Sequence, residues 1–368
     1  MYKNEMKKEI VFFMPSFEGG GVEKNIRMIA NYFASKNVKI SLITASKKVK
    51  KKFAKKIRFI SPKNHIWDKQ KRFIKFIICI YFLFKNYKKN KKINVFCFQG
   101  NILCILFCKI FGLSVVIRPN SSPSGWSTNY FKNVIFSKIL KLSDNIVVNS
   151  YDFKRELKSK FNLNSKCIYN PLNMNEIRRL SKKKIKFNFY RKNTINLISI
   201  GRLVEQKDHI TILKSLNCLK KKCNLRLLIL GEGNQKENLL NYVNRNNLNN
   251  LVKINKRTNN PYPYIRKSHI LLLSSKFEGL PNVLLEGIAL NKFIISSNCP
   301  TGPREILDNG KGGLLFKIEN YKELSEKILF YKRNYKLCLR KKKYARKRSI
   351  RFDYYKNLNE YFKLFKTL

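Results

Sequence analysis

The chain has 368 residues, enough for two domains that each bury a full hydrophobic core. Hydrophobic residues make up 44% of it, which excludes an intrinsically disordered chain. Its 78 Lys and Arg against 22 Asp and Glu give a net charge of +56, which favours a polyanionic partner: nucleic acid or an anionic membrane surface. The alternative is a genome rich in Lys, Asn and Ile, which would supply much of the same excess.

The cysteines and the lengths of the apolar runs exclude further classes of protein. The nine Cys residues are scattered, and none forms a C-x-x-C pair. An odd number without metal-ligand spacing argues against a disulfide framework or a structural zinc and fits a reducing cytoplasm. Residues 1–9 are polar, and no apolar run reaches the roughly 18 residues that span a bilayer, so we expect neither a signal peptide nor a spanning helix. No nucleic-acid-binding module is found, so no nucleic-acid partner is expected.

Strand and helix patterns alternate along the chain, which predicts an α/β fold with parallel sheets. In the first half we expect strands near residues 10–14, 38–44, 57–60, 95–98, 114–118, 145–149 and 167–169, with helices at 69–87, 101–111 and 151–160. In the second half we expect strands near 195–200, 226–230, 252–254, 269–273, 293–296 and 313–316, with helices at 208–221, 235–246, 281–290, 321–331 and 349–365. The predicted organisation is a first domain of residues 1–174, a linker of 175–194, a second domain of 195–345, and a C-terminal helix within 346–368 that crosses back to the first domain.

A glycine loop follows the first predicted strand. Gly19, Gly20 and Gly21 come in succession and open a helix, so the backbone there can approach an anion closely. The pattern is not G-x-G-x-x-G and does not support a dinucleotide fingerprint. The alternative is an ordinary strand-to-helix turn.

The segment of residues 73–84 is apolar apart from Lys75 and has basic residues at both ends. It is typical in the first place of a core helix of the first domain. The alternative is an interfacial helix that dips into lipid headgroups, and the two can coexist. Farther along, Arg118 and Asn120 follow another strand pattern, and a loop with Trp126 comes next. We expect this segment either on the acceptor side of a binding site or in a solvated surface loop.

Two cations follow the first strand of the second half. Gly201 ends that strand, and Arg202 and Lys207 lie in the loop after it, where open α/β sheets bind ligands. Arg offers a bidentate fork for phosphate. The alternative for Lys207 is an ordinary surface lysine.

The most informative stretch is residues 278–287, EGLPNVLLEG, which follows a buried-strand pattern. Its Gly/Pro loop opens an apolar helix, whose N-terminus offers free N–H groups and the positive end of a dipole. Glu278 lies in the loop and Glu286 in the helix, so two carboxylates accompany an anion site. A nucleotide sugar, with a diphosphate and hydroxyl groups, is such a ligand. The alternative is a capped core helix with two surface carboxylates.

The sequence of residues 274–287 resembles the Glu-x7-Glu motif of the retaining GT-B glycosyltransferases of group 1, family 4. Residues 201–207 resemble the family's Gly-Arg…Lys element, and residues 20–23 resemble its Gly-Gly-Val-Glu loop. Residues 298–306 and 310–316 resemble the end of its donor domain. The resemblance covers nearly the whole chain. It implies two Rossmann-like domains whose parallel sheets face a central cleft.

The resemblance also implies roles. Arg202 and Lys207 would hold the donor diphosphate, Glu278 would contact the donor sugar, and Glu286 would bind the ribose hydroxyls. The remaining donor-binding residues would be Gly201, Gly279, Leu280, Pro281 and Asn282, with Gly20, Gly21, Arg118 and Asn120 on the acceptor side of the cleft. No Asp-x-Asp occurs, so these cations and the helix start would replace the usual metal clamp, and neither metal nor cofactor is expected. The chain lacks the His that many relatives place near the sugar; Arg118 and Asn120 stand at that place.

The leading interpretation is a retaining, metal-independent glycosyltransferase of polysaccharide biosynthesis. It would move a hexose or N-acetylhexosamine from a nucleotide sugar, in the first place a UDP-sugar, to a lipid-linked or surface-glycan acceptor. It would be cytoplasmic, and peripheral on the inner face of the cell membrane, because its charge suits an anionic surface. Two alternatives stay open: a GT-B UDP-sugar epimerase, and a non-catalytic basic membrane- or RNA-binding protein on the same scaffold.

Overall fold

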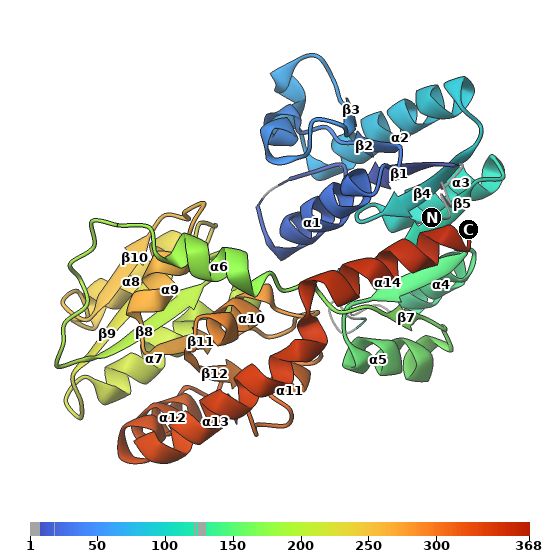
Figure 1. Ribbon diagram of the computed structural model, residues 1–368. Helices are drawn as coiled ribbons and strands as arrows, with labels where there is room; N and C mark the ends of the chain where they lie inside the picture. The colour runs from blue at the N-terminus through green and yellow to red at the C-terminus, as the bar shows by residue number, and fades with distance from the viewer. Residues whose placement is uncertain (1–7, 18, 121–122, 124–129) are drawn as a thin grey trace. The chain divides into compact units, whose positions relative to one another are not determined.

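A computed structural model describes residues 8–17, 19–120, 123 and 130–368. It divides the chain into two compact units, each built on its own parallel sheet (Figure 1). The first unit comprises Met1–Pro171 and Tyr355–Leu368, and the second comprises Leu172–Tyr354.

The first unit contains a seven-stranded sheet in the order β3-β2-β1-β4-β5-β6-β7. Its strands are short apolar runs, as expected of a parallel sheet that is covered on both faces. They are β1 (Glu9–Phe13), β2 (Ile40–Ile43), β3 (Arg58–Ile60), β4 (Ile93–Cys97), β5 (Ser114–Ile117), β6 (Asn145–Val148) and β7 (Lys166–Cys167).

Helices cover both faces of this sheet. They are α1 (Gly21–Ser35), α2 (Arg72–Lys89), α3 (Asn101–Ile110), α4 (Tyr130–Lys141), α5 (Tyr151–Phe161) and α14 (Tyr354–Lys366), with 3-10 turns η1 (Lys47–Lys52) and η2 (His65–Lys69). Helix α14 comes from the far end of the chain and packs through aromatic rings: Phe365 lies 5.0 Å from Phe96 of β4, and Phe362 lies 5.5 Å from Phe33 of α1, measured between ring centroids.

The second unit contains a six-stranded parallel sheet in the order β10-β9-β8-β11-β12-β13. Its strands are β8 (Ile195–Ile200), β9 (Leu225–Leu230), β10 (Val252–Asn255), β11 (Ile270–Leu273), β12 (Phe293–Ser297) and β13 (Leu314–Phe316). Its helices and turns are α6 (Met174–Ser181), η4 (Glu205–Lys207), α7 (His209–Leu219), α8 (Lys236–Arg245), α9 (Tyr262–Lys267), α10 (Asn282–Ala289), α11 (Pro303–Ile306), α12 (Tyr321–Arg333), α13 (Tyr335–Arg348) and η5 (Ser349–Phe352).

Two sequence predictions need correction. The segment expected to be a linker, residues 175–194, begins with helix α6, because Asn173 caps it: the Asn173 side chain accepts a hydrogen bond from Glu176 N at 3.0 Å. The C-terminal helix expected over residues 349–365 begins only at Tyr354, because Asp353 before it has an extended backbone, with ψ of 137°.

Each sheet has one point at which the strand order reverses. It lies between β1 and β4 in the first unit and between β8 and β11 in the second. Loops leaving the carboxyl ends of two such strands run in opposite directions, and open α/β sheets bind ligands in the crevice between them. Gly20 and Gly21 follow β1, Arg202 and Lys207 follow β8, and residues 278–282 follow β11.

Candidate active site

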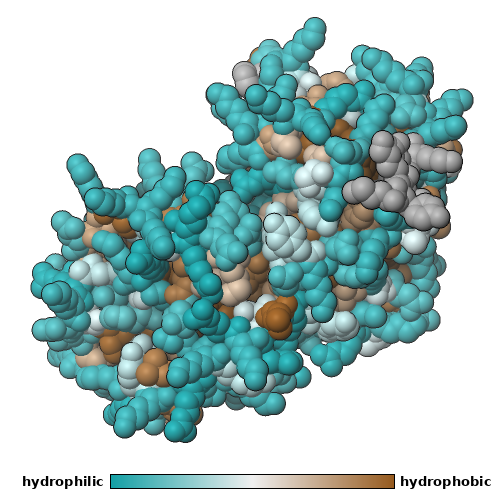
Figure 2. Space-filling view, viewed as in Figure 1, coloured by the Kyte–Doolittle hydropathy of each residue, from teal (hydrophilic) through white to brown (hydrophobic). Residues whose placement is uncertain are grey.

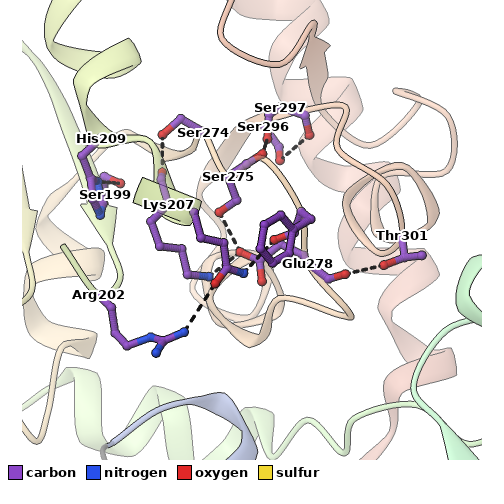
Figure 3. Close-up of polar contacts among 12 residues, drawn as sticks. Ser199, Arg202, Lys207, His209, Ser274, Ser275, Glu278, Ser296, Ser297 and Thr301 are labelled. Atoms are coloured by element: carbon purple, nitrogen blue, oxygen red, sulfur yellow. Dashed lines mark hydrogen bonds and ion pairs between the residues drawn. The ribbon is translucent and has the colours of Figure 1, made fainter. Parts of the chain in front are cut away.

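The loops after β8 and β11 bring Lys207 and Glu278 together. Lys207 Nζ forms an ion pair with Glu278 Oε1, although 71 residues separate them in sequence (Figure 3). Ser275 Oγ donates to the same carboxylate oxygen at 2.7 Å. The two charged side chains are only 17% and 10% exposed. A mostly buried pair of this kind persists only when further hydrogen bonds satisfy it, as Ser275 does here.

Backbone groups tie the same two loops together. Ser274 Oγ donates to Lys207 O at 2.9 Å, and Gln206 Nε2 donates to Phe277 O at 2.9 Å. Lys276 N also donates to Gln206 O at 2.9 Å. Arg202 remains exposed and donates to Gln206 Oε1 at 3.4 Å. Lys207 is therefore a fixed cation in this site, and Arg202 is an exposed one.

A third loop, after β12, holds the start of α10 in place. Thr301 Oγ1 donates to Glu278 O (Figure 3). Gly302 has a φ of +86°, and a Cβ there would lie 2.3 Å from Gly279 O. Only glycine permits this approach. Pro281 is the N-cap of α10, and Asn282 is its first residue. The first turn of α10 adjoins the loop that carries Glu278.

Glu286 lies on the same helix but in a different environment. Its side chain is buried, and Tyr262 Oη, from the first residue of α9, donates to Glu286 Oε1 at 3.4 Å. This hydroxyl orients a carboxylate within the helix that starts at the site, which is compatible with the predicted contact to ribose hydroxyls.

The first-unit candidates surround the reversal point of the other sheet. Gly20 is the N-cap of α1 and Gly21 its first residue, and Glu23 Oε1 accepts from Gly19 N. A Cβ at Gly20 would meet nothing within 4 Å, so this backbone is open to a ligand. The segment with Trp126 lies outside the described residues.

Arg118 occupies a different environment from the open cation suggested by its position in the sequence. It is fully buried and donates to three neutral groups: Tyr361 Oη at 2.9 Å, Asn120 Oδ1 at 3.1 Å and Asn170 Oδ1 at 2.6 Å. Within the described part of the chain no carboxylate pairs with it. Arg118 thus ties β5 to α14, and Asn120 is the half-buried member of the network that a ligand could reach.

His209 is a residue that the sequence analysis missed. It is the first residue of α7, and its Nδ1 lies 3.2 Å from Ser199 Oγ of β8 (Figure 3). Its Nε2 would lie 3.6 Å from a Cβ on Gly201, and among the described residues nothing hydrogen-bonds to that nitrogen. Burial, followed by the nearby Lys207 charge, lowers the pKa of His209 to about 4. A neutral imidazole therefore supports the loop that carries Arg202 and Lys207.

The lowered pKa of His209 predicts a loss of stability in mild acid. Between its ordinary pKa of 6.5 and the folded value of about 4, the unfolded chain binds a proton that the folded chain does not. The free energy of unfolding should fall by about 2 kcal/mol more in the wild type than in His209→Gln between about pH 7.5 and about pH 5. Urea unfolding at both pH values measures this difference, since His269 and all other groups are common to both chains. Equal losses in the two proteins would contradict the assignment.

Comparison with known proteins finds a family model and several relatives. Residues 181–348 match the model described as Glycosyl transferases group 1. An uncharacterized glycosyltransferase of Methanocaldococcus jannaschii is 32% identical over 217 residues, which are 55% of this chain and 53% of that protein. The N-acetylgalactosamine-N,N'-diacetylbacillosaminyl-diphospho-undecaprenol 4-alpha-N-acetylgalactosaminyltransferase of Campylobacter jejuni is 28% identical over 260 residues, 67% of this chain and 69% of that one. The match thus spans about half the length of the first relative.

The fold is shared over almost the whole length with a solved structure, Anabaena HepE in complex with UDP-glucose. The TM-score is 0.79 at 14% identity, covering 98% of this chain and 100% of that one. The predicted GT-B architecture of two parallel-sheet α/β domains is confirmed. Residues 181–348, which lie in the second unit, thus match the group 1 glycosyl transferases, and the curated relatives named above are glycosyltransferases.

Proposed function

We propose that this protein transfers a hexose or N-acetylhexosamine from a UDP-sugar to a lipid-linked or surface-glycan acceptor, at the inner face of the cell membrane. The observation that carries the proposal is the Lys207–Glu278 pair at the point where the strand order of the second sheet reverses. It supplies one cation and one carboxylate at the entrance to α10. A diphosphate needs the cation, and sugar hydroxyls need the carboxylate as a hydrogen-bond acceptor.

In this proposal each of the remaining donor-binding residues contacts a different part of the nucleotide sugar. The exposed Arg202 and the first turn of α10 face the negative charge of the diphosphate, while Lys207 is fixed beside it. Glu278 accepts hydrogen bonds from the sugar, and Glu286, oriented by Tyr262, accepts them from the ribose. In this arrangement the cations stabilise the charge that develops on UDP as it leaves.

The transfer that fits these groups is a same-face displacement. The bond between the anomeric carbon and the β-phosphate oxygen breaks, and its electron pair stays on the phosphate. The acceptor hydroxyl oxygen then bonds to the anomeric carbon from the same face, and its proton passes to the β-phosphate. Configuration is thereby retained, and Arg202 and Lys207 take the place of a metal ion as the counter-charge.

The relatives support the choice of substrates. The Anabaena structure holds UDP-glucose, and the name of the Campylobacter relative specifies a diphospho-undecaprenol acceptor. Both facts belong to those proteins. For this chain they favour a UDP-sugar donor and an acceptor that carries a lipid diphosphate.

A donor assay tests the proposal and its metal independence together. UDP should raise the melting temperature more than GDP, ADP or dTDP, and a UDP-sugar should then be consumed with transfer to a lipid-linked acceptor. Because protein cations face the diphosphate, the rate should be unchanged by EDTA. Inactivation by EDTA with rescue by Mn²⁺ would show a metal site. An altered free UDP-sugar in the absence of acceptor would indicate the epimerase instead.

Arg202→Ala should reduce kcat/KM by about 30-fold or more, equivalent to about 2 kcal/mol of transition-state stabilisation, because it removes a charged donor from the leaving diphosphate. Arg245→Ala is the matched control, since Arg245 is an exposed arginine on α8 of the same unit. Steady-state kinetics on both variants give the comparison. If Arg202→Ala turned over as fast as the control, Arg202 would have no role in stabilising the leaving diphosphate.

Glu286→Gln should raise the KM for the donor with a smaller change in kcat, because it preserves size and weakens a charge-assisted hydrogen bond to the ribose. Separate titrations of donor and acceptor locate the effect. If the affinity for the acceptor fell while that for the donor stayed constant, Glu286 would belong to another subsite.

A further inference from the structure

Four cationic or protonatable residues of the second unit gather at the amino edge of its sheet. His269 directly precedes β11, and Lys292 directly precedes β12. Because β11 and β12 are parallel neighbours, these two residues lie at the same edge of the sheet, opposite the candidate active site. Arg266 lies on α9, and Lys342 lies on α13, which packs against β12. We call Arg266, His269, Lys292 and Lys342 the base cluster.

Two lysines of the base cluster are partly withdrawn from water. Hydrophilic residues predominate on the face of the molecule seen in Figure 2, so an exposed cation by itself marks no site in this chain. Lys292 and Lys342, by contrast, are half-buried. Lysines are seldom withdrawn from water unless an acid pairs with them, because the lost hydration of the charge has to be compensated.

Lys292 keeps part of its hydrogen-bonding capacity available. Its Nζ donates to Arg266 O at 2.6 Å and to Ser268 O at 2.7 Å, two carbonyls at the end of α9. An ammonium group has three N–H donors, so these contacts leave one. Burial, followed by the charges of Lys342 and Arg266, lowers the pKa of Lys292 to about 8. An anion beside this group would stabilise its charged form.

No acid of the described chain compensates the cluster. The side chains of Lys342 and Arg266 form neither an ion pair nor a hydrogen bond with any described residue. The segments around the cluster, residues 238–277, 287–304 and 327–352, contain no Asp or Glu. Burial lowers the pKa of Lys342, and its charge in turn acts on both Lys292 and His269. The base cluster is therefore a concentration of positive charge without an internal partner.

His269 adds a directed donor to the cluster. Asn196 N donates to His269 Nδ1 at 3.0 Å, so the proton of the neutral ring is on Nε2. That N–H has no acceptor among the described residues, and His269 is exposed. Partial desolvation, followed by the charges of Lys292 and Lys342, lowers the pKa of His269. A neutral N–H thus lies near two ammonium groups.

We infer that the base cluster binds a phosphate group at the edge of the second sheet opposite the donor loops. A tetrahedral phosphate accepts hydrogen bonds from several donors at once, and Arg and Lys bind it through charge-assisted hydrogen bonds. Because no acid lies in the segments that form the cluster, a phosphate would not have to displace an ion pair. The inference concerns a site away from the donor loops and stands independently of the proposed transfer reaction.

Melting temperatures of the full-length protein test the inference. Inorganic phosphate should raise the melting temperature of the wild type more than sodium chloride at equal ionic strength. In chloride, Lys342→Gln should melt at or above the wild-type temperature, because it removes a half-buried charge that repels Lys292. The same variant should weaken phosphate binding about tenfold or more. Lys343→Gln is the matched control, since Lys343 is the next residue of α13 and is exposed.

Histidine NMR signals locate the bound ion. The chain has three His, of which His209 lies beside the donor loop and His269 in the base cluster. Phosphate should shift the His269 signal in a saturable way and raise the pKa of His269 by about 1, and His269→Gln assigns the signal. Lys342→Gln should abolish this response, and Lys343→Gln should preserve it.

The contrary outcomes are equally distinct. Absence of a saturable His269 shift overturns the inference, whatever the response of His209. So does a His269 response that is equal in phosphate and chloride, or one that survives in Lys342→Gln. Glycerol phosphate separates two sources of the same group: tighter binding than inorganic phosphate assigns the site to a phosphate ester, and weaker binding assigns it to the free ion.

Discussion

The ion pair between Lys207 and Glu278 organises the second unit's binding edge. It joins loops from β8 and β11, the two strands at which the sheet order reverses, and Ser275 completes the carboxylate's hydrogen bonding. Loss of either partner would leave a mostly buried charge, and such charges are costly. Glu278 fixes the position of Lys207, whereas Arg202 lies exposed at the start of the same loop. The pair is thus a scaffold for the site as well as a part of it.

Backbone packing around that pair leaves no room for side chains. A Cβ at Gly231 would lie 2.0 Å from Gly201 O, and one at Gly302 would lie 2.3 Å from Gly279 O. The loops after β8, β9, β11 and β12 therefore stack backbone against backbone at the carboxyl edge of the sheet. His209 is buried beside the first of them, with its Nε2 3.6 Å from the position of a Cβ on Gly201. The glycines and the uncharged histidine have one cause in common: the loops at this edge of the sheet are closely packed.

The sequence predicted well whatever depends on local patterns. Apolar runs predicted the positions of the strands. The motif sequences singled out Lys207 and Glu278, each without reference to the other. The contact between them could not be predicted from local pattern, because it depends on β8 and β11 being neighbours. The burial of Arg118 was missed for the same reason: its partners Tyr361 and Asn170 lie 243 and 52 residues away. Helix α6 was not predicted, although Asn173 and Glu176 form a local capping signal. The polar, basic composition of residues 175–194 is typical of a linker and hides that signal.

The positions of the exposed apolar residues add to what the net positive charge alone says about the surface. A biased composition raises Lys, Ile and Phe throughout a chain, so it cannot by itself favour particular helices. Helices α5 and α12 carry acids that pair with lysines four residues away, as Glu156 does with Lys160 and Glu323 with Lys327. Helices α2, α3 and α4 carry none and instead expose apolar side chains. A biased composition can raise the amount of positive charge, but the concentration of exposed apolar side chains on these three helices is a matter of position, which composition alone does not determine.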